Sequence, residues 1–170
     1  MKSNNIYVIH GYTSSSKSEW FPWLKEQFKD SSIKVNVPDM PDSEDPHLEP
    51  WINHLHKCIM DIDENTILIG HSFGCITALR YILEKNIKIK GAILISGFMN
   101  KNPMDEQTEG LQEFVDSPLD VARIKSLIPK RIAITAIDDD IVSTEATQKI
   151  IKRVRRKSYY SSIRKAFYRS

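Results

Sequence analysis

The sequence predicts an α/β protein with a doubly wound, mostly parallel sheet and helices on both of its faces. Short apolar, β-branched runs alternate along the chain with longer amphipathic stretches. The runs are apolar at every position, as in Ile67–Ile69 and Ala92–Ile95, which is typical of parallel strands covered on both sides. Such an alternation favours right-handed crossovers between neighbouring parallel strands.

Each expected element follows from this alternation. We expect strands at Ile6–Ile9, Ile33–Val37, Thr66–Ile69, Gly91–Ser96 and Arg131–Ala136. We expect helices at Trp20–Phe28, His47–Met60, Phe73–Glu84, Leu119–Leu127 and Ser143–Val154. The polar segment Gly97–Pro118 is interpreted as a mobile cover over the site. Ligands of such sheets bind beyond the carboxyl ends of the strands, so chemistry is expected in the loops there.

Length and composition indicate the class of protein. A chain of 170 residues, 41% of them hydrophobic and 27% charged, suits one globular domain with a substantial core. No apolar run approaches the roughly 18 residues needed to span a bilayer, and the first residues lack a signal-peptide pattern. Two cysteines, Cys58 and Cys75, are too few for a disulfide framework or a zinc site. We therefore expect a cytoplasmic protein with no membrane span and no metal site.

The net charge of +2 conceals an abrupt asymmetry. All 22 acidic residues lie at or before Glu145, whereas nine of the 24 basic residues lie in residues 149–170. Residues 1–148 therefore carry a net charge of −7 and the last 22 residues carry +9. We accordingly divide the chain into a domain at residues 1–151 and an atypical basic tail at residues 152–170.

The clearest chemical motif is Gly-His-Ser-Phe-Gly at Gly70–Gly74, between a predicted strand and a predicted helix. A G-x-S-x-G motif at a strand-to-helix turn is typical of a nucleophile elbow, which presents a serine hydroxyl above the sheet. Ser72 is therefore the candidate nucleophile, and the Phe73 N–H at the helix N-terminus is a candidate oxyanion donor. The alternative is a serine that caps a helix between two packing glycines. Elbow geometry directs the adjacent His71 away from Ser72 Oγ, so we interpret His71 as a packing or hydrogen-bonding residue.

A second motif, His-Gly-Tyr-Thr at His10–Thr13, follows the first predicted strand. An N–H from such a loop completes the oxyanion hole in folds with a nucleophile elbow, and the Tyr12 backbone N–H is our candidate. His10 and Gly11, together with Trp20, are candidates for substrate contacts. The alternatives are that the motif is a simple strand-ending turn, that His10 braces the loop, and that Trp20 packs a helix onto the sheet.

Three aspartates at Asp138–Asp140 follow the last predicted strand. The acid of a catalytic triad belongs on a loop after a late strand, in the chain order Ser, Asp, His. Its role is to orient the imidazole and to stabilise the imidazolium that forms. Asp139 is the candidate, and a solvated acidic loop with a helix N-cap is the alternative.

With these motifs, the chain resembles the small serine-hydrolase family of retinoblastoma-binding protein 9 and the bacterial YdeN-like proteins. The matching pieces are Val8–Tyr12, Trp20, Pro38–Pro41, Trp51, Gly70–Gly74 and Asp138–Val142. The resemblance covers residues 5–151 and implies a compact α/β-hydrolase that needs no cofactor and forms an acyl-enzyme on Ser72 from a small ester or amide. The family pattern is Asp, two residues, Val and commonly Pro. Asp139 fits it as the triad acid, with Ser143 in place of the proline.

The family also implies a further strand and a turn that carries the triad histidine after the Asp. No histidine follows Asp139 in this sequence, because all five precede it: His10, His47, His54, His56 and His71. Without an imidazole, Ser72 has no general base at neutral pH, and loss of a triad member typically costs about 10⁴–10⁶ in rate. We therefore expect an impaired serine hydrolase or, alternatively, a catalytically dead pseudo-hydrolase that binds a ligand or a protein partner.

The basic tail lacks the apolar run of a final strand. Back-translated with A/T-rich codons and read after removal of one base near Lys152, it can give Lys-Glu-Leu-Gly-Glu-Lys-Val-Ile-Ile-Pro-Gln-Ser-Gly-Lys-His-Phe-Ile-Glu. This second frame holds a strand and a histidine near the position of Ala166, so we interpret the tail as a frameshift product. A genuine tail, with Tyr159 and Tyr160 among basic residues, could contact phosphates of nucleic acid or anionic lipid. A frayed cationic tail is the simpler alternative, and no nucleic-acid partner is expected.

Overall fold

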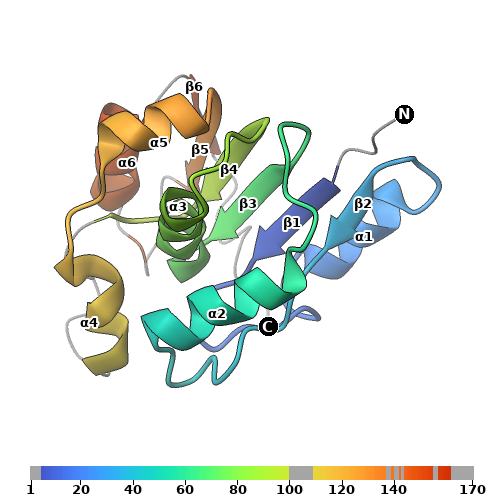
Figure 1. The fold of residues 1–170 in the computed structure, drawn as a ribbon, viewed down its shortest axis with the longest axis horizontal. Coiled ribbons are helices and arrows are strands. Elements are labelled where there is room, and N and C mark those ends of the chain that lie inside the picture. The colour runs from blue at the N-terminus through green and yellow to red at the C-terminus, as the bar shows by residue number, and fades with distance from the viewer. Residues whose placement is uncertain are drawn as a thin grey trace.

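A computed structural model of the chain describes residues 5–99, 109–136, 139, 142, 144–154 and 157–161 (Figure 1). In this part of the chain the strands form one sheet with the order β2-β1-β3-β4-β5-β6, and all neighbours are parallel. The strands are β1 (Asn5–Ile9), β2 (Lys34–Asn36), β3 (Ile67–His71), β4 (Gly91–Ile95), β5 (Lys130–Ala136) and β6 (Lys157–Ser161). The helices are α1 (Phe21–Phe28), α2 (Leu48–Cys58), α3 (Phe73–Lys85), α4 (Glu109–Asp116), α5 (Val121–Leu127) and α6 (Thr144–Val154).

Two apolar clusters cover the two faces of the sheet. Alternate residues of β1 belong to different clusters, as expected for side chains that alternate across a strand. Tyr7 and Ile9 join the cluster that holds buried residues of α2, α3, α4, α5 and α6. Ile6 and Val8 join the cluster formed with Phe21 of α1. The two clusters confirm the predicted doubly wound sheet with helices on both faces, and Figure 1 shows α1 beside β2.

Local sequence explains where several helices begin and end. α1 carries a proline in its first turn, where the missing N–H has no intrahelical partner to lose. The side chain of Asp120 caps α5 by accepting the backbone N–H of Arg123 at 2.9 Å. α3 ends at Asn86, which adopts the left-handed conformation that terminates many helices.

The strand order places a switch point between β1 and β3. From β1 the chain first builds β2 on one side and then β3 to β6 on the other. Ile9 is paired in register with Gly70, so β1 and β3 end side by side. The loop after β1 and the turn after β3 therefore meet at the position where open α/β sheets bind their ligands.

Two elements differ from the predictions. The segment Gly97–Pro118 contains helix α4, whose Leu111 and Phe114 are buried in the core, so this part of the predicted cover belongs to the packed fold. Residues 100–108 lie outside the described residues. None of the helices in the described part of the chain is long and apolar enough to cross a bilayer.

The second difference is strand β6, which pairs in parallel with β5 at the edge of the sheet. Residues 157–161 thus form a strand beside β5, although the basic tail lacks the apolar run expected of one. An edge strand bonds to one neighbour only and tolerates charged residues, and tyrosine favours strands. An apolar run was therefore too strict a criterion for this position.

Candidate active site

Ser72 occupies a strained turn between β3 and α3. Its backbone has φ 52° and ψ −122°, a left-handed conformation that is uncommon for a residue with a side chain. The Ser72 N–H donates to the carbonyl of Ile95 at 2.9 Å, and the Ser72 carbonyl accepts from the N–H of Cys75 at 3.0 Å. Backbone strain of this kind persists only where the surroundings hold it, and it is concentrated at functional sites.

The two glycines of the motif allow α3 to lie against the strands. A Cβ at Gly74 would lie 1.9 Å from the carbonyl oxygen of Ile9. A Cβ at Gly70 would lie 2.5 Å from the Cα of Cys75. Both distances are far below van der Waals contact with backbone atoms, so any side chain here would push the helix off the sheet. The motif therefore has a packing reason in addition to its chemical one.

The loop after β1 lies directly against Ser72. A Cβ at Gly11 would be 2.9 Å from the Cβ of Ser72, 3.2 Å from the carbonyl oxygen of His71 and 3.4 Å from the nitrogen of Phe73. The absence of a side chain at Gly11 thus lets this loop reach both the nucleophile and the helix N-terminus. Tyr12, the residue that follows, is partly buried and packs on the core. The predicted oxyanion donors, at Tyr12 and Phe73, come from two segments that the structure brings together.

His10 supports this loop from inside the protein. Its side chain is fully buried, its Nε2 accepts the backbone N–H of Met40 at 2.9 Å, and its Nδ1–H donates to the carbonyl of Gly11 at 2.9 Å. Burial lowers the pKa of His10, which keeps the imidazole neutral for these two bonds. Both ring nitrogens of His10 are engaged and its side chain is buried, so this geometry favours bracing of the loop over a substrate contact.

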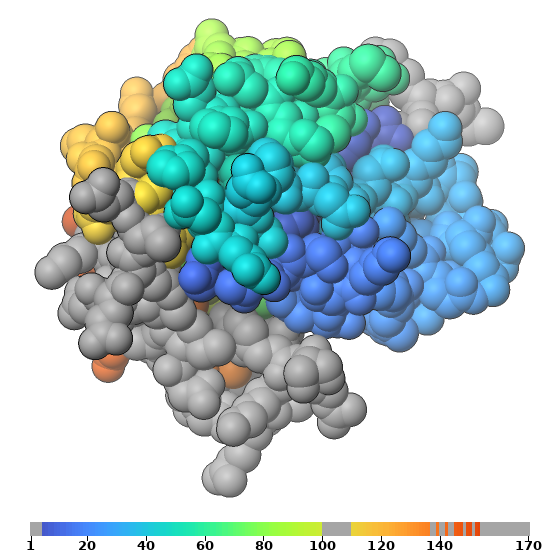
Figure 2. Space-filling view, turned by 90° about the horizontal axis from the view of Figure 1, so that it is seen from below, coloured from blue at the N-terminus to red at the C-terminus, as the bar shows by residue number. Residues whose placement is uncertain are grey.

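The same loop is fixed to a neighbouring segment that leads toward α2. The N–H of Thr13 donates to the carbonyl of Ser43 at 2.8 Å. The N–H and hydroxyl of Ser16 donate to the two carboxylate oxygens of Asp39 at 2.6 and 3.0 Å. The bond from the Ser16 N–H is the main cause that lowers the pKa of Asp39. Figure 2 shows the segment after β1 lying beside the segment before α2 on one face of the molecule.

His71 forms a buried pair with a residue that the motifs did not indicate. Its Nδ1 lies 2.8 Å from Oε2 of Glu19, and the two side chains are 1% and 13% exposed. Trp20 lies beside this pair, with its ring centroid 6.2 Å from that of His71. His71 is thus a packing and pairing residue, as predicted. Glu19 was missed because a single acidic residue in a polar loop belongs to no pattern.

Asp139 follows β5 at the same edge of the sheet as Ser72. Its Oδ1 accepts the backbone N–H of Val142 at 2.9 Å, which closes a short turn, and its Oδ2 is buried. The neighbouring residues Asp138 and Asp140 lie outside the described residues. Because carboxyl ends of parallel strands share one edge, this carboxylate lies at the edge where the elbow ends.

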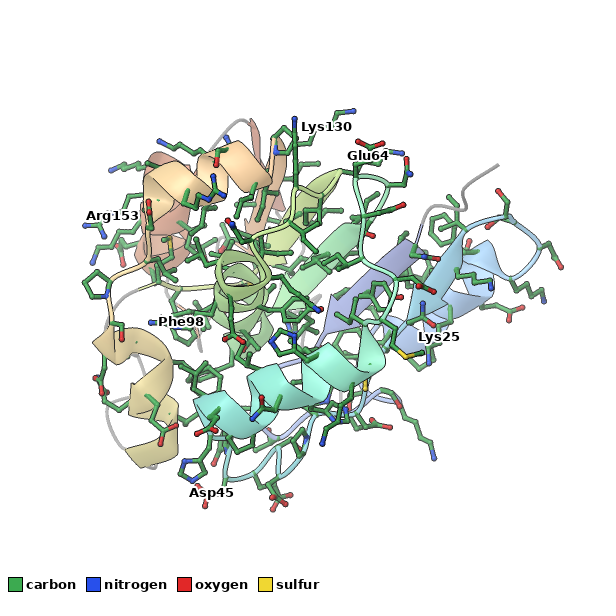
Figure 3. All side chains as sticks on the ribbon, in the orientation of Figure 1. Lys25, Asp45, Glu64, Phe98, Lys130 and Arg153 are labelled. Carbon is green, nitrogen blue, oxygen red and sulfur yellow. The ribbon has the colours of Figure 1, made fainter. Side chains whose placement is uncertain are left out.

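The side chains packed against the start of α3 are mostly apolar and buried. Phe73 packs edge to face on Phe98 and Phe114, with ring centroids 4.7 and 5.8 Å away. Figure 3 shows Phe98 in the interior beside α3. Cys75, directly below, donates its Sγ–H to the carbonyls of Gly70 and Ile95, and burial raises its pKa. A thiol in this environment is inert, so Cys75 does not replace the serine.

The remaining histidines point to the surface rather than to the elbow. Each contacts a partner on a helix surface: His47 with Glu113, His54 with Cys58, and His56 with Glu84. Among the described residues, no group of three or more histidine, cysteine, aspartate or glutamate side chains is placed to hold a metal ion. All five histidines therefore have contacts that account for them without a role beside Ser72.

An open groove of 620 Å³ lies between α2, α3 and α4. It is lined by Leu48, Glu49, Ile52, Asn53, Arg80, Leu83, Glu84 and Glu113. None of the predicted site residues lines this groove. The candidate chemistry is therefore at the edge of the sheet, not between these helices.

Comparisons with known proteins find similar sequences and structures. Residues 6–160 match the family model for serine hydrolases, which reaches into β6. The chain is 32% identical over 154 residues to the putative hydrolase YdeN of Bacillus subtilis, covering 89% of this chain and 80% of that protein. The crystal structure of the B. subtilis ydeN product has a TM-score of 0.85 at 30% identity, covering 95% of this chain and 86% of that one. The rat serine hydrolase RBBP9 is 24% identical over 141 residues, covering 82% of this chain and 73% of that protein.

Proposed function

The chain belongs to the serine hydrolase family, and on this premise we propose that Ser72 is the nucleophile that attacks the carbonyl carbon of a small ester or amide. The observation that carries the proposal is the strained backbone of Ser72, φ 52°, at a turn that Gly11 approaches closely. A capping serine needs no such conformation, because helix N-caps are normally extended. The strain therefore favours a hydroxyl presented for chemistry.

Two backbone donors and one helix would stabilise the oxyanion. The Phe73 N–H lies at the N-terminus of α3, where unpaired N–H groups and the helix dipole favour negative charge. The Tyr12 N–H comes from the loop that lies against Ser72. Donors already fixed in place act on the charge that develops in the transition state, and one such donor is typically worth about 10²–10³ in rate. Gly11 and Trp20 are proposed to border the site of the acyl group.

The proposed acylation lacks its usual base. Ser72 Oγ bonds to the substrate carbon, the bond to the alcohol or amine breaks, and the serine proton leaves with that group. Asp139 is proposed as the triad acid, but no histidine follows it in the sequence to receive the proton. Water must then carry the proton, so we expect slow acylation and slower deacylation.

A fluorophosphonate probe tests the nucleophile directly. The probe phosphonylates an activated serine, so we expect slow, saturable labelling that disappears in Ser72→Ala. Ser126→Ala, which removes an exposed hydroxyl on α5, is the matched control and should label like the wild type. A wild-type chain that stays unlabelled, or labelling that survives in Ser72→Ala, contradicts the proposal and favours the pseudo-hydrolase alternative.

A further inference from the structure

The carboxylate of Glu19 connects the loop after β1 to the nucleophile elbow. Its Oε1 accepts from the Ser14 hydroxyl at 3.3 Å, and its Oε2 lies 2.8 Å from His71 Nδ1. Ser14 is two residues after Tyr12, and His71 is the residue directly before Ser72. One side chain thus joins the two segments that supply the proposed oxyanion donors.

The backbone conformation of the loop is consistent with a selected role for this carboxylate. Glu19 has φ 57° and Thr13 has φ 55°, both in the left-handed region that favours glycine. A residue with a long side chain is unfavourable there, unless its contacts hold it in place. At Glu19 those contacts are Ser14 and His71, both almost completely buried.

Two other hydrogen-bonded anchors of the loop reach a different segment. The bonds of Ser16 to Asp39 lie on the exposed side, and the bond of Thr13 to Ser43 joins the segment before α2. They fix the loop to its outer neighbour. Glu19 provides a side-chain link from this loop to the strand that precedes the nucleophile.

We propose that Glu19 is a positioning residue, which holds the Tyr12 N–H at the distance from Ser72 that oxyanion binding requires. This inference rests on the proposed role of Ser72. Without the carboxylate, the loop keeps its outer anchors but loses its fixed spacing from the elbow. Misplacement by about 1 Å can reduce a rate by as much as about 10²-fold, without changing how the ground state binds.

The test measures fluorophosphonate labelling of the full chain at a series of probe concentrations, which separates the maximal rate from the half-saturating concentration. We expect Glu19→Ala to lower the maximal rate about tenfold, with the half-saturating concentration within about twofold of wild type. Glu19→Gln keeps the shape and an acceptor, so we expect it to recover most of the loss. Glu26→Ala, at an exposed position on α1, is the control and should label normally.

Hydrogen–deuterium exchange of the peptide covering residues 10–18 provides a readout that does not depend on reactivity. We expect faster exchange there in Glu19→Ala, and wild-type exchange in Glu26→Ala. Unchanged exchange together with an unchanged maximal rate in Glu19→Ala overturns the inference. An unlabelled wild type instead contradicts the proposed function, and exchange then decides alone whether Glu19 holds the loop. If Glu19→Ala does not fold, Glu19→Gln is measured in its place. We then expect a smaller drop in the maximal rate, and the absence of any drop overturns the inference.

Discussion

Gly74 and Gly11 both lie close to the turn that carries Ser72, and an added methyl group would affect them differently. At Gly74 the obstacle is backbone, the carbonyl oxygen of Ile9 at 1.9 Å. At Gly11 the nearest obstacle is the Cβ of Ser72 at 2.9 Å, with wider spacing to the backbone. The first glycine is therefore required for packing, and the second for access to the nucleophile.

We expect Gly74→Ala to destabilise the fold by about 3 kcal/mol or more, because β1 and α3 must separate to admit the methyl group. We expect Gly11→Ala to cost less stability, about 1 kcal/mol, and to reduce labelling of Ser72 strongly. Urea unfolding monitored by circular dichroism gives the first quantity, and the fluorophosphonate probe gives the second. Equal stabilities for the two variants would contradict the conclusion that Gly74 is required for packing and Gly11 for access to the nucleophile.

The residues of the elbow were predictable because their chemistry and their packing require the same pattern. Ser72, Phe73 and Gly11 could be identified from short motifs at the ends of apolar runs. The role of His10 could not be resolved, because its two partners include a backbone N–H 30 positions away. Glu19 could not be found at all, since its function depends on the three-dimensional approach of the loop to His71.

Helix α4 is held to its neighbours by polar contacts near its middle and at its end. Near its middle, Glu113 accepts from the Leu48 N–H at 3.0 Å and lies 2.9 Å from His47 Nδ1, at the start of α2. At its end, Arg80 of α3 donates to the carbonyls of Phe114 and Ser117 at 2.7 and 2.6 Å. Helix α4 is thus fixed to its neighbours. It could not be predicted from the sequence, because it lies in the polar segment Gly97–Pro118 and holds few apolar residues.

The contact between His47 and Glu113 should make the stability of α4 depend on pH. The contact raises the pKa of His47 above its ordinary 6.5 and lowers the pKa of Glu113 below its ordinary 4.5, and Asp45 and Asp42 add to the effect on His47. A raised histidine pKa stabilises the fold fully below pH 6.5, and this contribution is lost as pH rises through the raised pKa. A lowered glutamate pKa stabilises the fold above pH 4.5, and this contribution is lost as pH falls. Both contributions are therefore present together between about pH 5 and 6.5.

We expect Glu113→Gln to lower the thermal midpoint more at pH 6 than at pH 9, since the charged pair exists only at the lower value. Glu44→Gln, at an exposed position outside this contact, is the control and should show no such difference. Thermal unfolding followed by circular dichroism at the two pH values measures both variants. If Glu113→Gln lowers the thermal midpoint equally at pH 6 and pH 9, the prediction is contradicted. The stabilisation would then come from the hydrogen bond of the Leu48 N–H alone.

At the scale of the whole molecule, the C-terminal region occupies the position of a strand but has an unexpectedly basic sequence. The sheet continues through β6, and the family match extends to residue 160, so this region occupies the position of a final strand. Its sequence is nevertheless strongly basic, whereas residues 1–148 carry −7. Position in the fold and composition thus differ in this region, and the hypothesis of a reading frame that changes near Lys152 predicts such a difference.

The second reading frame would give this region a sequence that fits its position in the sheet. It places Val-Ile-Ile at positions 158–160, inside the strand Lys157–Ser161, so the same backbone would hold an apolar strand beside β5. It also places a histidine near the position of Ala166, after that strand in the sequence. The carboxyl edge already holds Ser72 and Asp139, so the histidine would join them in the chain order Ser, Asp, His.

We therefore expect the chain with the restored frame to hydrolyse short-chain aryl esters at least about 10³-fold faster than the chain with the basic tail, because a triad base typically contributes about 10⁴ or more. We also expect it to unfold at a higher temperature, since the edge strand becomes apolar. The matched control is the restored chain with its new histidine replaced by alanine, which should keep the gain in stability and lose the gain in rate. Coding DNA whose codons cannot yield the second frame, or a restored chain no faster than this control, would contradict the frameshift and leave the basic strand as the native edge of the sheet.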